Sequence, residues 1–451
     1  MRSSAELRRA RCAYSDGVPF VADLRTVLRR RDFRRLFAVR LVSQAGDGAF
    51  QVALASLIFF SPERAATAGA AAGALAASVL PYTLVGPFAG VLLDRWRRRQ
   101  ILLVANAVRV VIVLGIAALV ASGVVGPALY VVVLAALSVN RFFLAGLGAS
   151  LPHVVPRHEL VMANAVSPTC GTLAAIGGGF AAYGVRAALG TSDRTDAIVL
   201  VLAAVTYGAA ALLATRMAAD LLGPDHVTTG SPTAAADGQS GLASLVDGAR
   251  HVRERRPAFH ALAAIGVHRF AYGISFIATL LLCRNHFVDP SDVDAGFRLL
   301  ALVFGASAVG FALAALITPA ASARWRPAGW IWRCFAAAAV TEYVFVATIS
   351  VPLVLVGAVV LGIAAQGSKI CVDAIVQASV DDDYRGRVFA FYDVVFNLAF
   401  VVAAATAALV VPADGYSPPV YALIASLYVV AAVGYARAAA RRVPIELAPQ
   451  H

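Results

Sequence analysis

Lysine is almost absent from this sequence: Lys369 is the only one among the 451 residues, and the remaining basic residues are all arginine. Charge of either sign is scarce as well. Asp, Glu, Lys and Arg together make up 14% of the chain, whereas soluble domains carry roughly a quarter. Hydrophobic residues reach 60% and the mean hydropathy is +0.77. This composition excludes a secreted soluble domain and a disordered chain, and it indicates a protein that lies in a membrane.

The chain also lacks the spacing patterns of disulfide, metal and nucleotide sites. Its five cysteines are odd in number, scattered, and show no CxxC pair, which argues against a disulfide scaffold or a bound metal. No GxxxxGK[ST] phosphate loop occurs, and no nucleophile, base and orienting residue stand together. We therefore expect no cofactor, no metal and no enzymatic activity.

Long apolar runs recur along the chain, separated by short polar breaks. Each run is long enough to cross a bilayer as a helix, in which every backbone group is bonded internally, and the ten-residue alternation of a membrane barrel is missing. The sequence therefore predicts an all-α integral membrane protein with twelve transmembrane helices. The expected spans are 37–60, 69–93, 100–121, 127–150, 163–189, 196–218, 258–283, 296–320, 328–349, 353–378, 387–411 and 418–438.

The placement of the arginines predicts the orientation. Residues before 37 are arginine-rich and contain no apolar core ahead of a cleavage site, so they do not form a secretory signal. With this tail in the cytoplasm, 29 of the 38 basic residues fall on the cytoplasmic side, five outside and four within spans. The positive-inside rule then places both termini on the cytoplasmic side of the cell membrane. Because topology accounts for the net charge of +12, we expect the bilayer as a partner and no nucleic acid.

The spans divide six and six around the longest polar break. A shift of 229 residues aligns Arg40 with Arg269 and Arg95-Trp96-Arg97 with Arg324-Trp325-Arg326, as in proteins built from parallel repeats. The expected segments are a basic tail (1–36), a six-helix bundle (37–218), a cytoplasmic linker (219–257), a second six-helix bundle (258–438) and a cytoplasmic tail (439–451). Within the linker, residues 245–256 predict a short basic helix on the membrane surface or, equally, a solvated charged loop.

The loop between the second and third spans reads Gly90-Val-Leu-Leu-Asp94-Arg95-Trp-Arg97-Arg98-Arg99-Gln-Ile101. It resembles the cytoplasmic loop signature of the major facilitator superfamily, with Arg97 where that signature has Gly. The resemblance implies a cytoplasmic gate in which Asp94 meets the start of the eleventh span. The alternative is an anchor that serves only the positive-inside rule. The gate residues are Gly90, Asp94, Arg95, Arg98, Arg385 and Arg387.

Three further segments resemble the bacterial exporter branch of this superfamily, which includes siderophore (enterobactin-type) and multidrug efflux proteins. They are residues 34–47 at the first span, 151–165 after the fourth, and 377–392 after the tenth. The resemblance implies two pseudo-symmetric six-helix bundles and secondary active transport by alternating access. The fifth span lacks the Gly-Pro pair of many antiporters.

Asp47 lies about ten residues into the first span, roughly 15 Å at the rise of an α-helix. A charge at this depth is costly and is a functional candidate by default. Asp47 is predicted either to carry the coupling proton or to form a static ion pair with Arg109 or Arg141.

The remaining polar residues inside the spans are candidates for a midplane cavity. Lys369 and Asp373, spaced i and i+4, share a helix face and can pair. His268 is interpreted as a bundle histidine before a proton relay. The complete set is Arg109, Arg141, His268, Arg269, Glu342, Lys369, Asp373, Asp393 and Asn397.

The leading hypothesis is a monomeric secondary transporter that exports a small amphipathic molecule, such as a drug, a metabolite or a siderophore-like compound, against protons. The cavity charges leave open whether the substrate is cationic or anionic. One alternative keeps the fold and moves a lipid or lysolipid across the bilayer. Another, of a different class, is a membrane receptor or assembly partner without flux, which docks through the loop at 223–243.

Overall fold

The computed structural model describes residues 19–56, 93, 95–123, 127–190, 192–224, 241–289 and 292–440. Within these ranges the regular structure is helical. The elements are α2 (Pro19–Arg29), α3 (Arg31–Ser56), α5 (Arg98–Ala121), α6 (Pro127–Val154), η2 (Arg157–Glu159), α7 (Leu160–Leu189), α8 (Asp193–Thr215), α10 (Gly241–Glu254), α11 (Arg256–Leu281), η4 (Leu282–His286), α12 (Val293–Ala347), α13 (Val351–Ser379), η5 (Asp382–Tyr384), α14 (Arg385–Val410) and α15 (Pro418–Ala440).

Nine helices of the described chain are long and apolar enough to cross a membrane. One of them, within α12, spans 50 residues and corresponds to two predicted spans. It leaves helical geometry at Arg326, where φ is 62° and ψ is 155°. Because this backbone is not helical and Pro327 has no N–H to donate, α12 consists of two helices that meet at a kink at Arg326.

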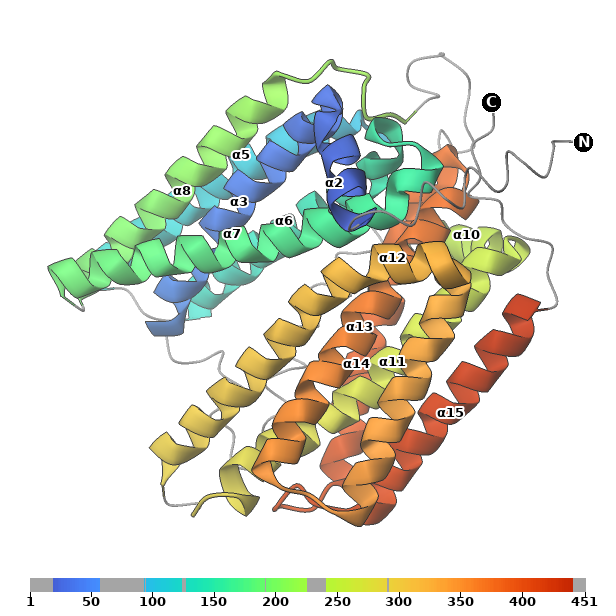
Figure 1. Cartoon of the computed structure of the whole chain (residues 1–451). Coiled ribbons are helices and arrows are strands. Elements are labelled where there is room, and N and C mark those ends of the chain that lie inside the picture. Colours follow the sequence, from blue (N-terminus) through green and yellow to red (C-terminus); the bar gives the residue numbers. More distant parts are fainter. Residues whose placement is uncertain are drawn as a thin grey trace, which may run out of the picture.

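The helices form two bundles, which we call the N-half (α3 and α5 to α8) and the C-half (α11 to α15) (Figure 1). The bundles meet at the end of the molecule where α10 lies, which we call the α10 end, and diverge toward the opposite end (Figure 1). Contacts between them run from α7 to α12 and α13 and from α6 to α13 and α14. The apolar core of the C-half centres on α11, and those of the N-half draw on α3, α5, α6, α7 and α8. One N-half core also reaches α12 and α13, where the two halves meet.

Glycine allows α3 and α7 to approach each other at backbone distance. A β-carbon at Gly48 would lie 1.7 Å from the Ala175 carbonyl oxygen, and one at Gly178 would lie 1.9 Å from that of Ala45. Small residues at such crossings let helices pack tightly in a membrane. This contact fixes the position of Asp47, one residue before Gly48.

Candidate functional site

A buried polar network occupies the centre of the N-half; we call Ser43, Asp47, Asn106, Arg109 and Tyr207 the N-half network. Arg109 of α5 forms an ion pair with Asp47 of α3 and donates to Ser43 Oγ at 2.9 Å. The Tyr207 hydroxyl of α8 donates to Asp47 Oδ1 at 3.0 Å. The Arg109 guanidinium also lies 3.6 Å from the centre of the Tyr207 ring. With Asp47 6% exposed and Arg109 2% exposed, both charges are compensated away from water.

The corresponding region of the other bundle holds the C-half cluster, formed by His268, Ser275, Glu342 and Tyr428. The Tyr428 hydroxyl of α15 lies 3.1 Å from His268 Nδ1 of α11, and the His268 ring stacks on Phe335. Glu342 of α12 is fully buried. Within the described ranges neither of its carboxylate oxygens makes a well-formed hydrogen bond, although the Ser275 hydroxyl lies close by.

A third set of charges lies where the two bundles face each other; we call it the inter-half charge cluster. Lys369 Nζ donates to Asp373 Oδ2 at 2.6 Å, and the Tyr392 hydroxyl donates to Asp373 Oδ1 at 2.7 Å. Arg141 of α6 is close enough to interact electrostatically with Asp393 and Arg269 of the C-half. Arg40 of α3 interacts in the same way with Asp373. The cluster consists of Arg40, Arg141, Arg269, Lys369, Asp373 and Asp393.

Arg269 differs from the other cations of the cluster in its surroundings. Its guanidinium lies over the rings of Phe396 and Phe400, 4.0 and 4.4 Å from their centres. Its buried Nε has no hydrogen-bond partner among the described residues. A cation held by aromatic faces, with a donor still unused, can receive an acceptor group from a ligand.

At the α10 end an ionic contact joins the bundles; we call Arg98, His153, Asp382 and Arg385 the latch. Arg98 of α5 donates to Asp382 Oδ1 at 2.9 Å and to its carbonyl oxygen at 3.2 Å, and it is fully buried. Arg385 pairs with the same carboxylate, and His153 Nε2 lies 3.5 Å from it. Asp382 therefore carries a charge-assisted contact between the halves.

One helix turn deeper, two amide side chains bridge the halves. Asn164 Nδ2 of α7 donates to Gln377 Oε1 of α13 at 2.6 Å, and Gln377 Nε2 donates to the Gly148 carbonyl oxygen of α6 at 3.1 Å. Both side chains are buried. This amide pair closes the α10 end without a net charge.

Helix α10 packs on the segment that carries the latch. Asp247 pairs with Arg387, and Arg255, just after α10, donates to Asp381 at 2.5 Å. The His251 ring stacks on Tyr384, with centres 4.2 Å apart. Burial lowers the pKa of His251 from its ordinary value, although Asp381 nearby acts in the opposite direction. The linker helix is thus docked on the C-half beside the contact that joins the two halves.

The predicted site residues separate into distinct locations. Five of the nine cavity candidates, Arg141, Arg269, Lys369, Asp373 and Asp393, lie in the inter-half charge cluster. Arg109 is instead buried inside the N-half, and His268 and Glu342 are buried inside the C-half. Asn397 is buried as well and donates to the Asp393 carbonyl oxygen of its own helix at 2.8 Å.

Among the predicted gate residues, Gly90 and Asp94 lie outside the described residues. Arg95 is exposed, Arg98 and Arg385 are part of the latch, and Arg387 holds α10. The described part of the chain contains no group of three His, Cys, Asp or Glu side chains placed to hold a metal ion.

Several contributors were not expected from the sequence. All three lie in segments that resemble exporters: Asp382, Asn164 and Gln377. The position of Asp382 near Arg385, and of the two amides near helix ends, could have indicated a contact between the halves. Tyr207 had no such signal, because one tyrosine in an apolar span looks the same whether its hydroxyl faces lipid or a carboxylate.

Comparison with known proteins defines the class. Curated relatives from Mycobacterium bovis and Mycobacterium tuberculosis, both described as uncharacterized MFS-type transporters, are each 37% identical over 394 residues, covering 87% of this chain and 88% of theirs. The chain therefore belongs to the major facilitator superfamily and is a multi-pass integral membrane transporter. No family model matches the sequence.

Solved structures confirm the predicted fold. A bacterial homologue of the iron transporter ferroportin in an outward-facing state superposes with a TM-score of 0.66 at 15% identity, covering 90% of this chain and 99% of that one. The MFS transporter FucP in its outward conformation gives 0.67 at 12% identity (90% and 98% covered). The human organic anion transporter MFSD10 gives 0.63 at 14% identity (89% and 99% covered).

Proposed function

We propose that this transporter exports small amphipathic organic anions, coupled to protons, by alternating access between its two halves. The inter-half charge cluster is the observation that carries the proposal. Among the described residues it contains four cations and two carboxylates, and one of those carboxylates, Asp373, is already bound to Lys369. The surplus is positive, so the cluster favours a substrate that brings negative charge.

The surroundings of Arg269 support an amphipathic rather than a purely polar anion. Phe396 and Phe400 flank its guanidinium and offer apolar area to the body of a ligand, while the unused Nε–H offers a donor to its anionic group. A siderophore-like or drug-like acid has both features.

Orientation and direction complete the proposal. With the α10 end in the cytoplasm, as the arginine distribution predicts, the contact between the halves closes the cytoplasmic side. Export is proposed from the segments that resemble exporters. This end would then open to load substrate and close again to release it outside.

Asp47 is the proposed coupling group. Protonation would remove its charge and release Arg109, which then stands uncompensated in a buried site and drives α3, α5 and α8 to rearrange. Coupling at Asp47 therefore requires that the ion pair opens during the cycle, in contrast to the static pair that the sequence left as the alternative.

Reconstituted vesicles test the substrate class. We expect uptake of labelled amphipathic acids into inside-out vesicles, driven by a pH gradient, and a loss of roughly tenfold or more for Arg269→Gln, since a charge-assisted hydrogen bond contributes about 1.5–3 kcal/mol. Arg333→Gln is the matched control, because Arg333 also lies on aromatic rings, 4.3 and 4.7 Å from the centres of Trp332 and Trp325, but outside the cluster. Preference for amphipathic cations would refute the substrate class, and gradient-independent lysolipid movement would favour a flippase.

The coupling group is tested with Asp47→Asn against Asp196→Asn. Asp196 is as buried as Asp47 and forms an ion pair with a half-buried arginine, Arg186, in the same half. If Asp47 couples, its variant loses gradient-driven flux while substrate binding persists, and Asp196→Asn keeps both. Gradient-driven flux that persists in Asp47→Asn would assign Asp47 to the static pair.

A further inference from the structure

A basic pocket lies at the α10 end, apart from the inter-half charge cluster and the latch. It has a volume of about 650 Å³ and is formed where α10 passes into α11 beside the last turns of α15. Its polar lining comes from Arg253, Arg256, His260 and Arg437, and Phe259 contributes an aromatic wall. No carboxylate lines it among the residues that the structure describes.

The three arginines of the pocket form no ion pair that stabilises the described part of the fold. Arg255, between two of them in sequence, pairs with Asp381 at 2.5 Å, but Arg253, Arg256 and Arg437 make no ion pair among the described residues. All three are exposed. Three arginines border one hollow, and no acid stands among its described lining residues, so the hollow favours an anion.

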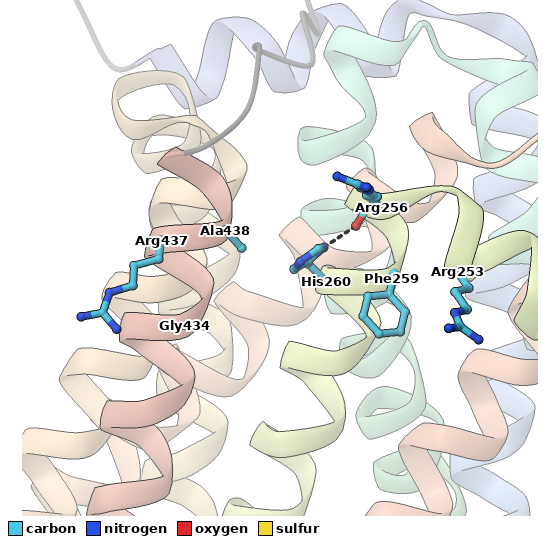
Figure 2. Close-up of a pocket in the computed structure, with 7 residues that line it drawn as sticks. All are labelled: Arg253, Arg256, Phe259, His260, Gly434, Arg437 and Ala438. Atoms are coloured by element: carbon cyan, nitrogen blue, oxygen red, sulfur yellow. Dashed lines mark hydrogen bonds between the residues drawn. The ribbon is translucent and has the colours of Figure 1, made fainter.

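The arrangement of the side chains suits a broad anionic group better than a small ion. Figure 2 shows Arg256 and His260 reaching from α11 toward α15, while Arg253 lies on the other side of α11, near Phe259, and Arg437 on the outer side of α15. The His260 ring is fixed because its Nδ1–H donates to the Arg256 carbonyl oxygen at 2.6 Å. Arg256 and His260 thus face the gap between α11 and α15, and Arg253 and Arg437 flank it on either side.

Exposed apolar side chains lie near the pocket, on α15 before Arg437 and at Phe259 of its lining. Val433 and Val430 on α15 are 41% and 70% exposed, and Phe259 is 46% exposed. Val430 stands two turns from Arg437, about 10 Å along the axis. A ligand here meets guanidinium groups at one level and apolar side chains at the next, which is the profile of a membrane lipid.

We propose that this pocket binds the phosphate of an anionic phospholipid head group from the leaflet at the α10 end, with the acyl chains along Val430 and Val433. Basic pockets at helix ends bind such head groups through charge-assisted, bidentate contacts to phosphate oxygens. The bound lipid would link Arg253, next to the docked end of α10, to α15. This role is independent of the transported substrate.

Native mass spectrometry and thermal unfolding of the purified full chain test the site, with phosphatidylglycerol as the probe and phosphatidylcholine as the neutral lipid. Phosphatidylglycerol should bind selectively and raise the unfolding midpoint. Arg256→Gln with Arg437→Gln should weaken this binding by roughly twentyfold or more, because each basic residue near an anionic surface contributes roughly fivefold. These positions are exposed, so an unchanged midpoint without anionic lipid verifies that the variant folds.

A matched double variant, Arg216→Gln with Arg250→Gln, removes two exposed arginines outside the pocket and should bind the lipid like the parent protein. Equal losses in both double variants would mean that overall charge, and not this pocket, attracts the lipid, and would overturn the proposal. Binding of glycerol phosphate and of inorganic phosphate distinguishes a soluble phosphate from a lipid head group as the ligand. If either binds as tightly as the lipid, the site takes a soluble phosphate and the lipid assignment is wrong.

Discussion

The two halves of the transporter bury polar groups at matching places and treat their charge differently. In each half a tyrosine of the last helix, Tyr207 or Tyr428, contacts a titratable side chain of the first helix 160 residues earlier, Asp47 or His268. The N-half network contains an acid and a base that compensate each other. In the C-half cluster the carboxyl of Glu342 has no cation beside it in the described structure.

The difference shows two ways of keeping a carboxyl group in a helix bundle. A buried charge is tolerated when a partner and several donors surround it, and it is costly when alone. The N-half retains the ionic form through Arg109, Ser43 and Tyr207. The C-half can retain Glu342 only as a group whose charge is not required, so the comparison predicts a large response to a neutral substitution in the N-half and a small one in the C-half.

The largest difference between the halves is expected when one ionisable side chain in each is replaced by glutamine. Arg109→Gln should lower the free energy of unfolding by about 3–5 kcal/mol, because it leaves Asp47 buried without its cation. Glu342→Gln, nearly the same shape, should change it by less than about 1 kcal/mol. Unfolding midpoints in detergent report both. A large loss for Glu342→Gln would show that Glu342 is ionised and would break the comparison.

A smaller difference is expected from the tyrosine hydroxyls. Tyr207→Phe removes a hydrogen bond to a charged group, worth about 1.5–3 kcal/mol, whereas Tyr428→Phe removes one to an imidazole nitrogen, worth about 0.5–1.5 kcal/mol. Both variants keep the ring, and in the N-half also the contact with Arg109, so unfolding midpoints isolate the hydroxyl. Equal losses of stability in the two variants would mean that the Asp47–Arg109 ion pair does not strengthen the hydrogen bond from Tyr207.

The smallest effect is expected from pH, and it concerns the α10 contact, which lies outside the N-half network and the C-half cluster. Burial lowers the pKa of His251 in the docked helix, so the undocked helix takes up a proton more readily. Docking should therefore weaken as pH falls below about 6.5, the ordinary histidine value, and recover as pH rises. Unfolding midpoints measured from pH 5 to 8 should show a shallower slope for His251→Gln than for the parent chain. Identical slopes would place the titrating group elsewhere.

The sequence predicted the class of fold because length and apolarity are the strongest signals in a membrane protein. Runs of apolar residues set the helices, and the turn at Arg326 falls between two predicted spans. Which charges belong together was less predictable. Asp47 could be proposed to pair with Arg109, but Glu342 and His268 were grouped with Lys369, because a single span does not show which face of its helix looks into its own bundle.

The coupling role of Asp47 and the gate role of Asp94 remain predictions. Asp94 lies outside the described residues, and among the described ones Arg98 and Asp382 form an ion pair that joins the halves. Arg98 was identified from its motif, but its partner could be found only from the packing of η5 against α5.

The pairing of Asn164 with Gln377 has a consequence for how fast the α10 end opens. Two amides can exchange their mutual hydrogen bonds for bonds to entering water one at a time, and neither leaves a charge stranded in an apolar contact. The inner part of the closure should thus add little to the energy barrier, and ions in solution should scarcely affect it. The ionic part is largely buried as well, since Arg98 is fully buried and the Asp382 side chain is 13% exposed. Separating this ion pair should therefore contribute most of the barrier, and added salt should change the rate of separation only slightly.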